Sequence, residues 1–415
     1  MSDLRYLDSP LVAELDAAPI TAEDELGALG ELTTGRPEPT GHRRSRPRRH
    51  LLARMVGRLG HLPEHEAPRS RAGWLVRASA LLLGVLVIGA GFIASYVGAL
   101  HEPQPHGVPI GVVNGDAGAQ ALLQAAPAGP LTAKVYADAG EVDAALADRQ
   151  VYAVLDTDPA ADGLRLTVAG GAAPGVAEYL TQVVSAMAGG AHIPLTVGDA
   201  HPLAARDPRG LTPFYLTLGW LLGGYLAATA LAVIVGTVPR GLARLAMRLA
   251  AFAIFSVALG LAGTLIVGPG YHIWTGNLGT LWATGTLVVF AAAAVTAALE
   301  SWVGLLGTGI AMLVLFVLGN PGSGGVYPPE FLPGPYRDLH RWLPTGQGTE
   351  LVRSVEYFGG HGLTWPATGL AGWAGGGLVL VLAATLALGR WRWREAAKSV
   401  IEVTPTDQPV AAKSG

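Results

Sequence analysis

GTLWATGTLVVFAAAAVTAAL, residues 279–299, is a run of 21 residues without a charged side chain. A helix rises 1.5 Å per residue, so about 20 apolar residues cross the roughly 30 Å hydrocarbon core of a bilayer. The run therefore predicts a membrane-spanning helix. The whole chain agrees with this interpretation, because 50% of its 415 residues are hydrophobic and only 14% are charged, which is too apolar for an ordinary soluble protein.

Further uncharged runs of similar length predict a polytopic α-helical membrane protein with about six transmembrane helices. None of the 28 basic and 31 acidic side chains lies inside them. The run at 78–100 starts too far from the amino terminus for a signal peptide, so we interpret it as a retained anchor. One alternative stays open, namely five helices and a re-entrant segment at 268–279. We expect residues 212–389 to form a five-helix membrane domain with an external loop at 320–367. The other predicted runs are 212–238, 249–267, 301–319 and 368–389.

The basic residues predict the orientation, because Lys and Arg close to membrane ends are retained on the cytoplasmic side. Residues 36–77 carry eleven Arg against three acids, and the loop 238–248 carries three Arg and no acid. Residues 101–211 instead hold twelve acids against five bases. We therefore expect both termini in the cytoplasm and residues 101–211 and 320–367 outside. Only three of the 28 basic residues are Lys, which favours a high-GC bacterial genome and hence a bacterial cytoplasmic membrane.

Residues 101–211 predict a small α/β extracytoplasmic domain between helices 1 and 2. Short apolar runs bounded by turn signals indicate strands, and the segments between them have helical character. The turn at 114–118 could bind a ligand, although a structural turn is the simpler interpretation. Without Cys, this domain must be stable through its own core. The expected strands are 108–114, 131–136, 151–155, 164–168 and 195–197, and the expected helices are 117–125, 141–149 and 176–187.

Both ends of the chain are predicted to be cytoplasmic tails. Residues 1–72 are first acidic and then Arg-rich and proline-punctuated, which predicts a disordered cytoplasmic tail. Its basic half either binds anionic membrane lipids or only sets the topology. Residues 390–415 form the second cytoplasmic tail. Because the basic inner face and the acidic outer domain nearly cancel in a net charge of −3, nucleic-acid binding is not implied.

Motifs for catalysis are missing from the sequence. No Lys lies in a P-loop pattern, so an ATP-driven step would need a separate subunit. His61 and His65 match a zinc-binding spacing, but Pro63 interrupts the helix that such a site requires. We expect no enzyme activity, no cofactor and no metal site. Glu300 is the one acid close to a bundle that is otherwise free of charge, and we expect it in a tight turn between helices 4 and 5, at the cytoplasmic interface.

The segment after the fifth run is rich in Gly and Pro, which prevents a continuing helix. It holds a Pro-Glu-x-x-Pro element (Pro329, Glu330, Pro333), a Leu-Pro element (Leu343, Pro344) and then Arg353. In this position the pattern resembles the ABC-2-type transporter permease family. The layout of one helix, an outer domain that opens with VPIGVVN at 108–114, and five helices is similar to the phage infection protein (Pip)-like branch of that family. The resemblance covers about residues 75–395, without the extended insertion of longer members.

The resemblance implies a permease-like subunit that works as a homodimer with a separate cytoplasmic P-loop ATPase and exports an amphipathic or hydrophobic substance. Arg240, Arg244, Arg248 and Glu300 would then face the ATPase. The Pro-Glu-x-x-Pro and Leu-Pro residues and Arg353 would form an external gate. The alternative is a non-transporting cell-envelope protein whose helices anchor an outer recognition domain. The small-residue spacings at 219–223 and 372–376 fit close helix packing in a bundle or a dimer.

Overall fold

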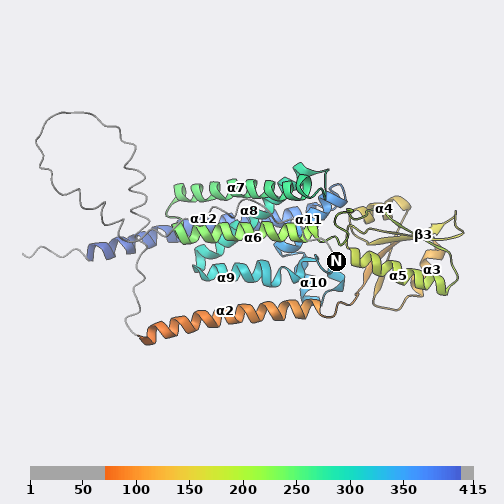
Figure 1. The fold of residues 1–415 in the computed structure, drawn as a ribbon, viewed down its shortest axis with the longest axis horizontal. Helices are drawn as coiled ribbons and strands as arrows, with labels where there is room; N and C mark the ends of the chain where they lie inside the picture. Colours follow the sequence, from red (N-terminus) through yellow and green to blue (C-terminus); the bar gives the residue numbers. More distant parts are fainter. Residues whose placement is uncertain (1–70, 403–415) are drawn as a thin grey trace, which may run out of the picture. The chain divides into compact units, whose positions relative to one another are not determined.

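The computed structural model describes residues 71–402 (Figure 1). The predicted disorder of the amino-terminal tail and the pattern at His61 and His65 lie outside these residues. The described chain is mostly helical and carries one small sheet. Its helices and sheet therefore agree with a membrane protein that has an α/β region.

Five helices of the described chain are long and apolar enough to cross a membrane. The fifth predicted run, 301–319, is divided, because α8 continues to Val303, Gly304 turns the chain with φ +69°, and a shorter apolar helix follows. That shorter helix consists of α9 (Leu306–Met312) and η2 (Leu313–Leu318). The five long helices are α2 (Arg71–Leu100), α6 (Thr212–Val235), α7 (Leu242–Leu265) continued by η1 (Ile266–Gly270), α8 (Leu278–Val303) and α12 (Thr364–Glu402).

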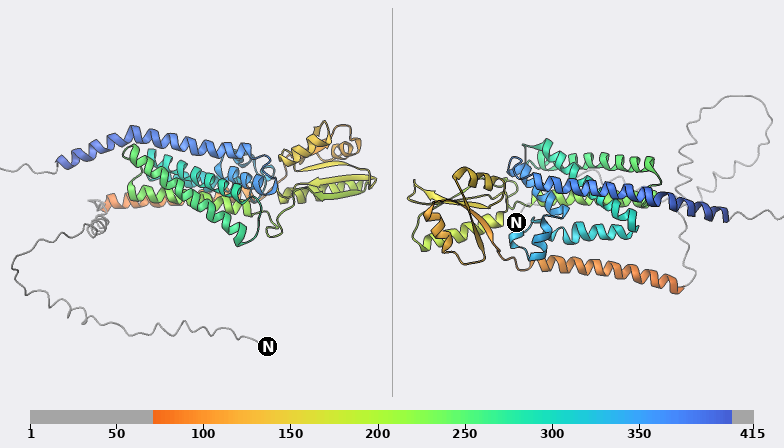
Figure 2. Two further views of the ribbon diagram at one scale, coloured as in Figure 1. Left: turned by 90° about the horizontal axis from the view of Figure 1, so that it is seen from above. Right: turned by 180° about the vertical axis from the view of Figure 1, so that it is seen from behind.

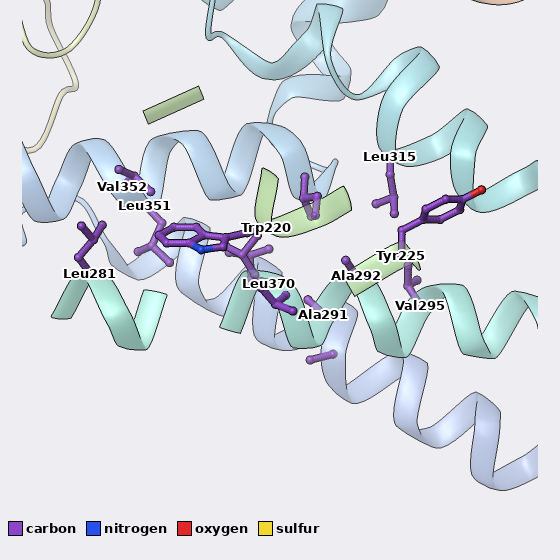
Figure 3. Packing of buried hydrophobic residues seen from close by; sticks show 14 of the residues in the cluster. Trp220, Tyr225, Leu281, Ala291, Ala292, Val295, Leu315, Leu351, Val352 and Leu370 are labelled. Carbon is purple, nitrogen blue, oxygen red and sulfur yellow. The ribbon is translucent and has the colours of Figure 1, made fainter. Parts of the chain in front are cut away.

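Helix α8 is the centre of the helical bundle, between α6, α7 and α12 (Figure 2). Its alanines at 291–294 are at most 1% exposed, as expected for a helix that is apolar on all sides and buried. Trp220 of α6 fills the space beside Gly285, where a Cβ atom would lie 2.5 Å from the indole ring. Figure 3 shows the apolar cluster that α6, α8, η2, α11 and α12 build around Trp220 and Tyr225.

The sheet domain has strand order β2-β1-β3-β4-β5, with all pairs parallel except β3 and β4. Helices α3 and α5 cover one face, and α4 covers the other (Figure 1). Each predicted strand and helix of this domain is present with small shifts at its ends. The strands are β1 (Val108–Val113), β2 (Leu131–Tyr136), β3 (Ala153–Asp158), β4 (Gly163–Val168) and β5 (Leu195–Asp199), and the helices are α3 (Ala117–Gln124), α4 (Ala139–Ala147) and α5 (Pro174–Gly190).

The segment between η2 and α12 is folded and largely buried. Residues 319–325 run without regular helix except for the short η3 (Pro321–Ser323), and every one of them is buried. Three elements follow, namely η4 (Pro329–Phe331), α10 (Gly334–His340) and α11 (Pro344–Tyr357). Helix α11 packs against α6, α8 and α12. The predicted external loop is therefore built into the bundle.

Candidate functional site

The sheet domain and the segment 319–358 share their apolar cores. Phe358, directly after α11, is 2% exposed and belongs to the cluster under α4. Phe331 of η4 packs against the opposite cluster, edge to face with Tyr179 at 5.6 Å between ring centroids. Gly171 also lies so close to Tyr357 that a Cβ atom there would be 2.7 Å from it. The outer domain is thus fixed to the bundle on both of its faces.

A buried ionic cluster lies at this junction. Glu350 of α11 receives hydrogen bonds from Arg149 Nη1 and from Arg353 Nη1, both at 2.7 Å. The Arg149 and Arg353 side chains are 7% and 3% exposed. Because Arg149 follows α4 of the outer domain and lies 201 residues from Glu350 in sequence, the cluster joins two distant parts of the chain. It holds two guanidinium groups for one carboxylate.

The surroundings set the charge of each group in the cluster. Burial alone would raise the pKa of Glu350, but Arg149 and Arg353 hold that pKa below its ordinary value. Burial lowers the pKa of His340, whose ring contacts the carbonyl oxygen of Gly322 at 3.1 Å. His340 is therefore neutral near pH 7, and the cluster carries one net positive charge.

A second polar pair lies beside this cluster. Tyr152 donates a hydrogen bond of 2.7 Å from its hydroxyl to Glu330 Oε2. Burial raises the pKa of Glu330 above its ordinary value, which favours the neutral acid. Arg337 of α10 donates through Nη2 to Leu332 O, while its Nε is buried without an acceptor among residues 71–402. The Nε atom of Arg149 is unpaired in the same sense.

All of these groups except Arg353 line a polar chamber of about 680 Å³ between the sheet domain and α10. Its remaining walls include Lys134, Arg341, Trp342 and Trp365. The guanidinium of Arg341 lies over the Trp365 ring, 5.5 Å from its centroid, an arrangement that attracts a cation to an aromatic face. The chamber has a volume typical of small-molecule sites, which measure about 300–1,000 Å³.

An apolar groove of about 920 Å³ adjoins the polar chamber. Arg341, Trp342 and Trp365 line both cavities. From there the groove follows one face of α12, lined at helical spacing by residues 365, 368, 369, 372, 373, 376, 377 and 380. The two cavities together form one amphipathic site that is polar at the outer domain and apolar along α12.

The residues predicted for an external gate lie around this site in different roles. Pro329 and Glu330 belong to η4 and both line the chamber, whereas Pro333 caps α10. Leu343 and Pro344 begin α11. Arg353 is buried, and it donates to Gly324 O at 2.9 Å as well as to Glu350. The structure thus brings Glu330 and Arg353 into one polar region, while the proline and leucine residues position helices.

The residues predicted to face an ATPase are arranged differently from the expectation. Arg248 is 5% exposed and donates to the carbonyl oxygens of Gly236 and Thr237, so it stabilises the α6–α7 loop. Arg240 and Arg244 are exposed and line a mostly apolar hollow of about 340 Å³.

The prediction that Glu300 lies in a tight turn is wrong. Glu300 lies in the last turn of α8 and is 0% exposed. Its Oε1 atom accepts hydrogen bonds from the hydroxyl groups of Thr229 and Thr308. The expectation rested on the cost of an isolated charge in a bundle, and these hydroxyl groups from α6 and α9 reduce that cost.

The predicted turn at 114–118 has a structural role. Asp116 accepts hydrogen bonds from Ala119 N at the start of α3 and from Thr157 N and Oγ1 at β3. Within residues 71–402, no group of three His, Asp or Glu side chains is placed to hold a metal ion. Sequence reasoning missed Arg149, Arg337, Arg341 and Trp365, and the one local signal for the cluster was the i,i+3 spacing of Glu350 and Arg353.

The chain matches no family model, no curated protein and no solved structure.

Proposed function

We propose that the chain is the permease-like membrane subunit of an ABC-2-type exporter, which moves an amphipathic or hydrophobic substance outward with a separate ATPase. The observation that supports this proposal is the continuity of the apolar α12 groove with the polar chamber at the outer domain. A substance with a polar and an apolar end fits both parts at once. An exporter needs such a place where its cargo leaves the lipid.

The rival function is a non-transporting envelope protein that presents an outer recognition domain. Such a domain needs only a tether, whereas here Phe331, Phe358 and Arg149 fix it to η4 and α11. A fixed domain that forms one wall of a cavity in the bundle favours the permease function. Binding of isolated envelope material by the outer domain alone would favour the rival.

The hollow beside Arg240 and Arg244 is the surface we assign to the ATPase. It combines an apolar lining with two exposed guanidinium groups, and aromatic or aliphatic anchors beside charged groups are typical of protein interfaces. Arg248 also lines the hollow, but it is buried and its guanidinium group is bound to the loop carbonyl groups, so we assign the contact with the ATPase to Arg240 and Arg244.

The test is purification of the tagged chain from its own membranes in mild detergent, with identification of partners and an ATPase assay. A stoichiometric P-loop ATPase is expected, and Arg240→Ala/Arg244→Ala should reduce its recovery about tenfold. The matched control is Arg206→Ala/Arg209→Ala, which removes two exposed Arg from the segment before α6 and should leave recovery unchanged. Repeated purification without any ATPase would contradict the exporter function.

A further inference from the structure

The polar chamber has the properties of an anion site. The chamber is lined by Arg149 and Arg337 against Glu330 and Glu350, and Arg353 is paired with Glu350 behind this lining, so three positive charges stand against two negative ones. In addition, the Nε atoms of Arg149 and Arg337 are buried without an acceptor among the described residues, and both side chains line the chamber. A buried donor without a partner destabilises the folded chain. An anionic group in the chamber would compensate the charge of these two guanidinium groups.

The acids of the chamber do not cancel this preference. Glu350 is paired with two Arg side chains, and Glu330, whose pKa is raised by burial, is engaged by the hydrogen bond from Tyr152. Asp148 and Asp338 are exposed at the rim. The buried part of the chamber therefore favours a negative ligand group.

The adjoining groove has the properties of a site for an apolar tail. Its lining follows α12 from Trp365 to Leu380, about 22 Å at 1.5 Å per residue, which exceeds the roughly 15 Å of one leaflet of the hydrocarbon core. Gln347, at 3% exposed, also lines the groove and leaves its Oε1 unpaired. Because Trp342 and Trp365 stand where the groove meets the chamber, the boundary has the aromatic residues typical of a membrane–water interface.

Two glycines of the groove keep it open. A Cβ atom at Gly372 or Gly376 would meet no other atom within 4 Å. Gly369 and Gly377 are different, because a Cβ atom there would lie 2.3 Å from Gln347 and 2.7 Å from Ala294. Gly369 and Gly377 are thus required for helix packing, whereas Gly372 and Gly376 provide space.

We propose that this site binds a membrane amphiphile with an anionic head group, whose head lies in the chamber beside Arg149, Arg337 and Arg341 and whose tail lies along the α12 groove. If the chain is an exporter, as proposed above, this amphiphile is the substance that it exports. Binding itself needs no ATPase. The amphiphile enters sideways from the outer leaflet, past Trp342 and Trp365.

The test is photocrosslinking of the full-length chain in mild detergent with two lipids that carry a diazirine in the tail, phosphatidylglycerol and phosphatidylcholine. Phosphatidylglycerol is expected to label residues 365–380 about tenfold more than phosphatidylcholine, in line with the strength of hydrogen bonds to charged groups. Arg341→Gln, at an exposed position, should reduce this preference severalfold. Because the tail contributes to binding, an excess of glycerol phosphate should reduce labelling by phosphatidylglycerol only weakly. Complete loss of labelling would assign the chamber to a soluble anion and overturn the proposal.

The groove is tested by Gly372→Leu and Gly376→Leu, which should each reduce labelling of α12 about fivefold by filling space. The matched control is Gly375→Leu on the same helix, which also meets no atom within 4 Å but does not line the groove. Equal labelling by both lipids, or labelling that Gly372→Leu leaves unchanged, would overturn the proposal. Crosslinks between two copies at Gly372 would also overturn it by assigning the groove to a homodimer. If the chain binds the lipid but no ATPase is purified with it, the lipid site is supported and only the exporter function is contradicted.

Discussion

Glu350 is the residue on which the junction between the outer domain and the bundle depends electrostatically. Replacement by Gln would leave Arg149 and Arg353 buried close together without a carboxylate. Removal of one partner from a buried ionic group costs about 3–5 kcal/mol, so we expect Glu350→Gln to destabilise the chain by this amount. Thermal unfolding of the purified chain in detergent measures the effect.

The control for Glu350 is Asp338→Asn, which changes an exposed acid of the same chamber and should alter stability by less than about 0.5 kcal/mol. The double variant Arg149→Met/Glu350→Gln removes one guanidinium group together with the carboxylate, so it should recover part of the stability that Glu350→Gln loses. If Glu350→Gln unfolds at the same temperature as the parent, the ionic cluster does not stabilise the junction.

The partly buried carboxyl group of Glu356 should make the stability of the folded chain depend on pH. Burial raises its pKa from 4.5 to about 7, since the ionised carboxylate is poorly solvated and its Oε1 has no partner among the described residues. A raised acid pKa favours folding below pH 4.5, and this contribution is lost as pH rises to about 7. Allowing for partial exposure, Glu356→Gln should stabilise the chain by about 1–2 kcal/mol at pH 8 and hardly at all at pH 4.5. An equal effect at both pH values would contradict the raised pKa.

At the scale of elements, α6 shows which small residues matter for packing. The predicted pair at 219 and 223 is not the main contact with α8, because a Cβ atom at Gly219 would meet nothing within 4 Å. At Gly224 it would lie 2.2 Å from Val289 O and 2.9 Å from Ala292. We expect Gly224→Ala to cost about 1–3 kcal/mol by overpacking, while Gly219→Ala is neutral. The unfolding midpoints of the two variants are compared at one pH. Equal midpoints would disprove the close contact of Gly224 with α8.

The elements also show how far the sequence could predict the structure. Strands of the outer domain were predictable because each ends at a turn signal, and the long helices because uncharged runs have one physical solution in lipid. The turn between α8 and α9 was predicted at Glu300 and lies at Gly304 instead, since the apolar residues on both sides of Gly304 give no signal for its position. Arg149 could not be placed either, because its partner Glu350 is 201 residues away and only tertiary packing brings them together.

At the scale of the whole molecule, the number of membrane crossings depends on the short apolar helix at 306–318. Thirteen residues at 1.5 Å give about 20 Å, less than the roughly 30 Å of hydrocarbon. Irregular backbone is tolerated at membrane depth only where protein buries it. Residues 319–325 are all buried, with Gly322 O and Gly324 O bound by His340 and Arg353, so this segment could complete the crossing.

Cysteine labelling tests the crossings directly, since the chain has no Cys of its own. With both termini inside, a membrane-impermeant maleimide should label Asp143→Cys and Asp338→Cys in intact cells, and Ala243→Cys and Leu306→Cys only after permeabilisation. All four positions are exposed, and Ala292→Cys at 0% exposure is the unlabelled control. Labelling of Leu306→Cys and Asp338→Cys from opposite sides would make the short helix a sixth crossing, because only residues 307–337 separate them. Labelling of both from the same side would leave five crossings and place the two termini on opposite faces of the membrane.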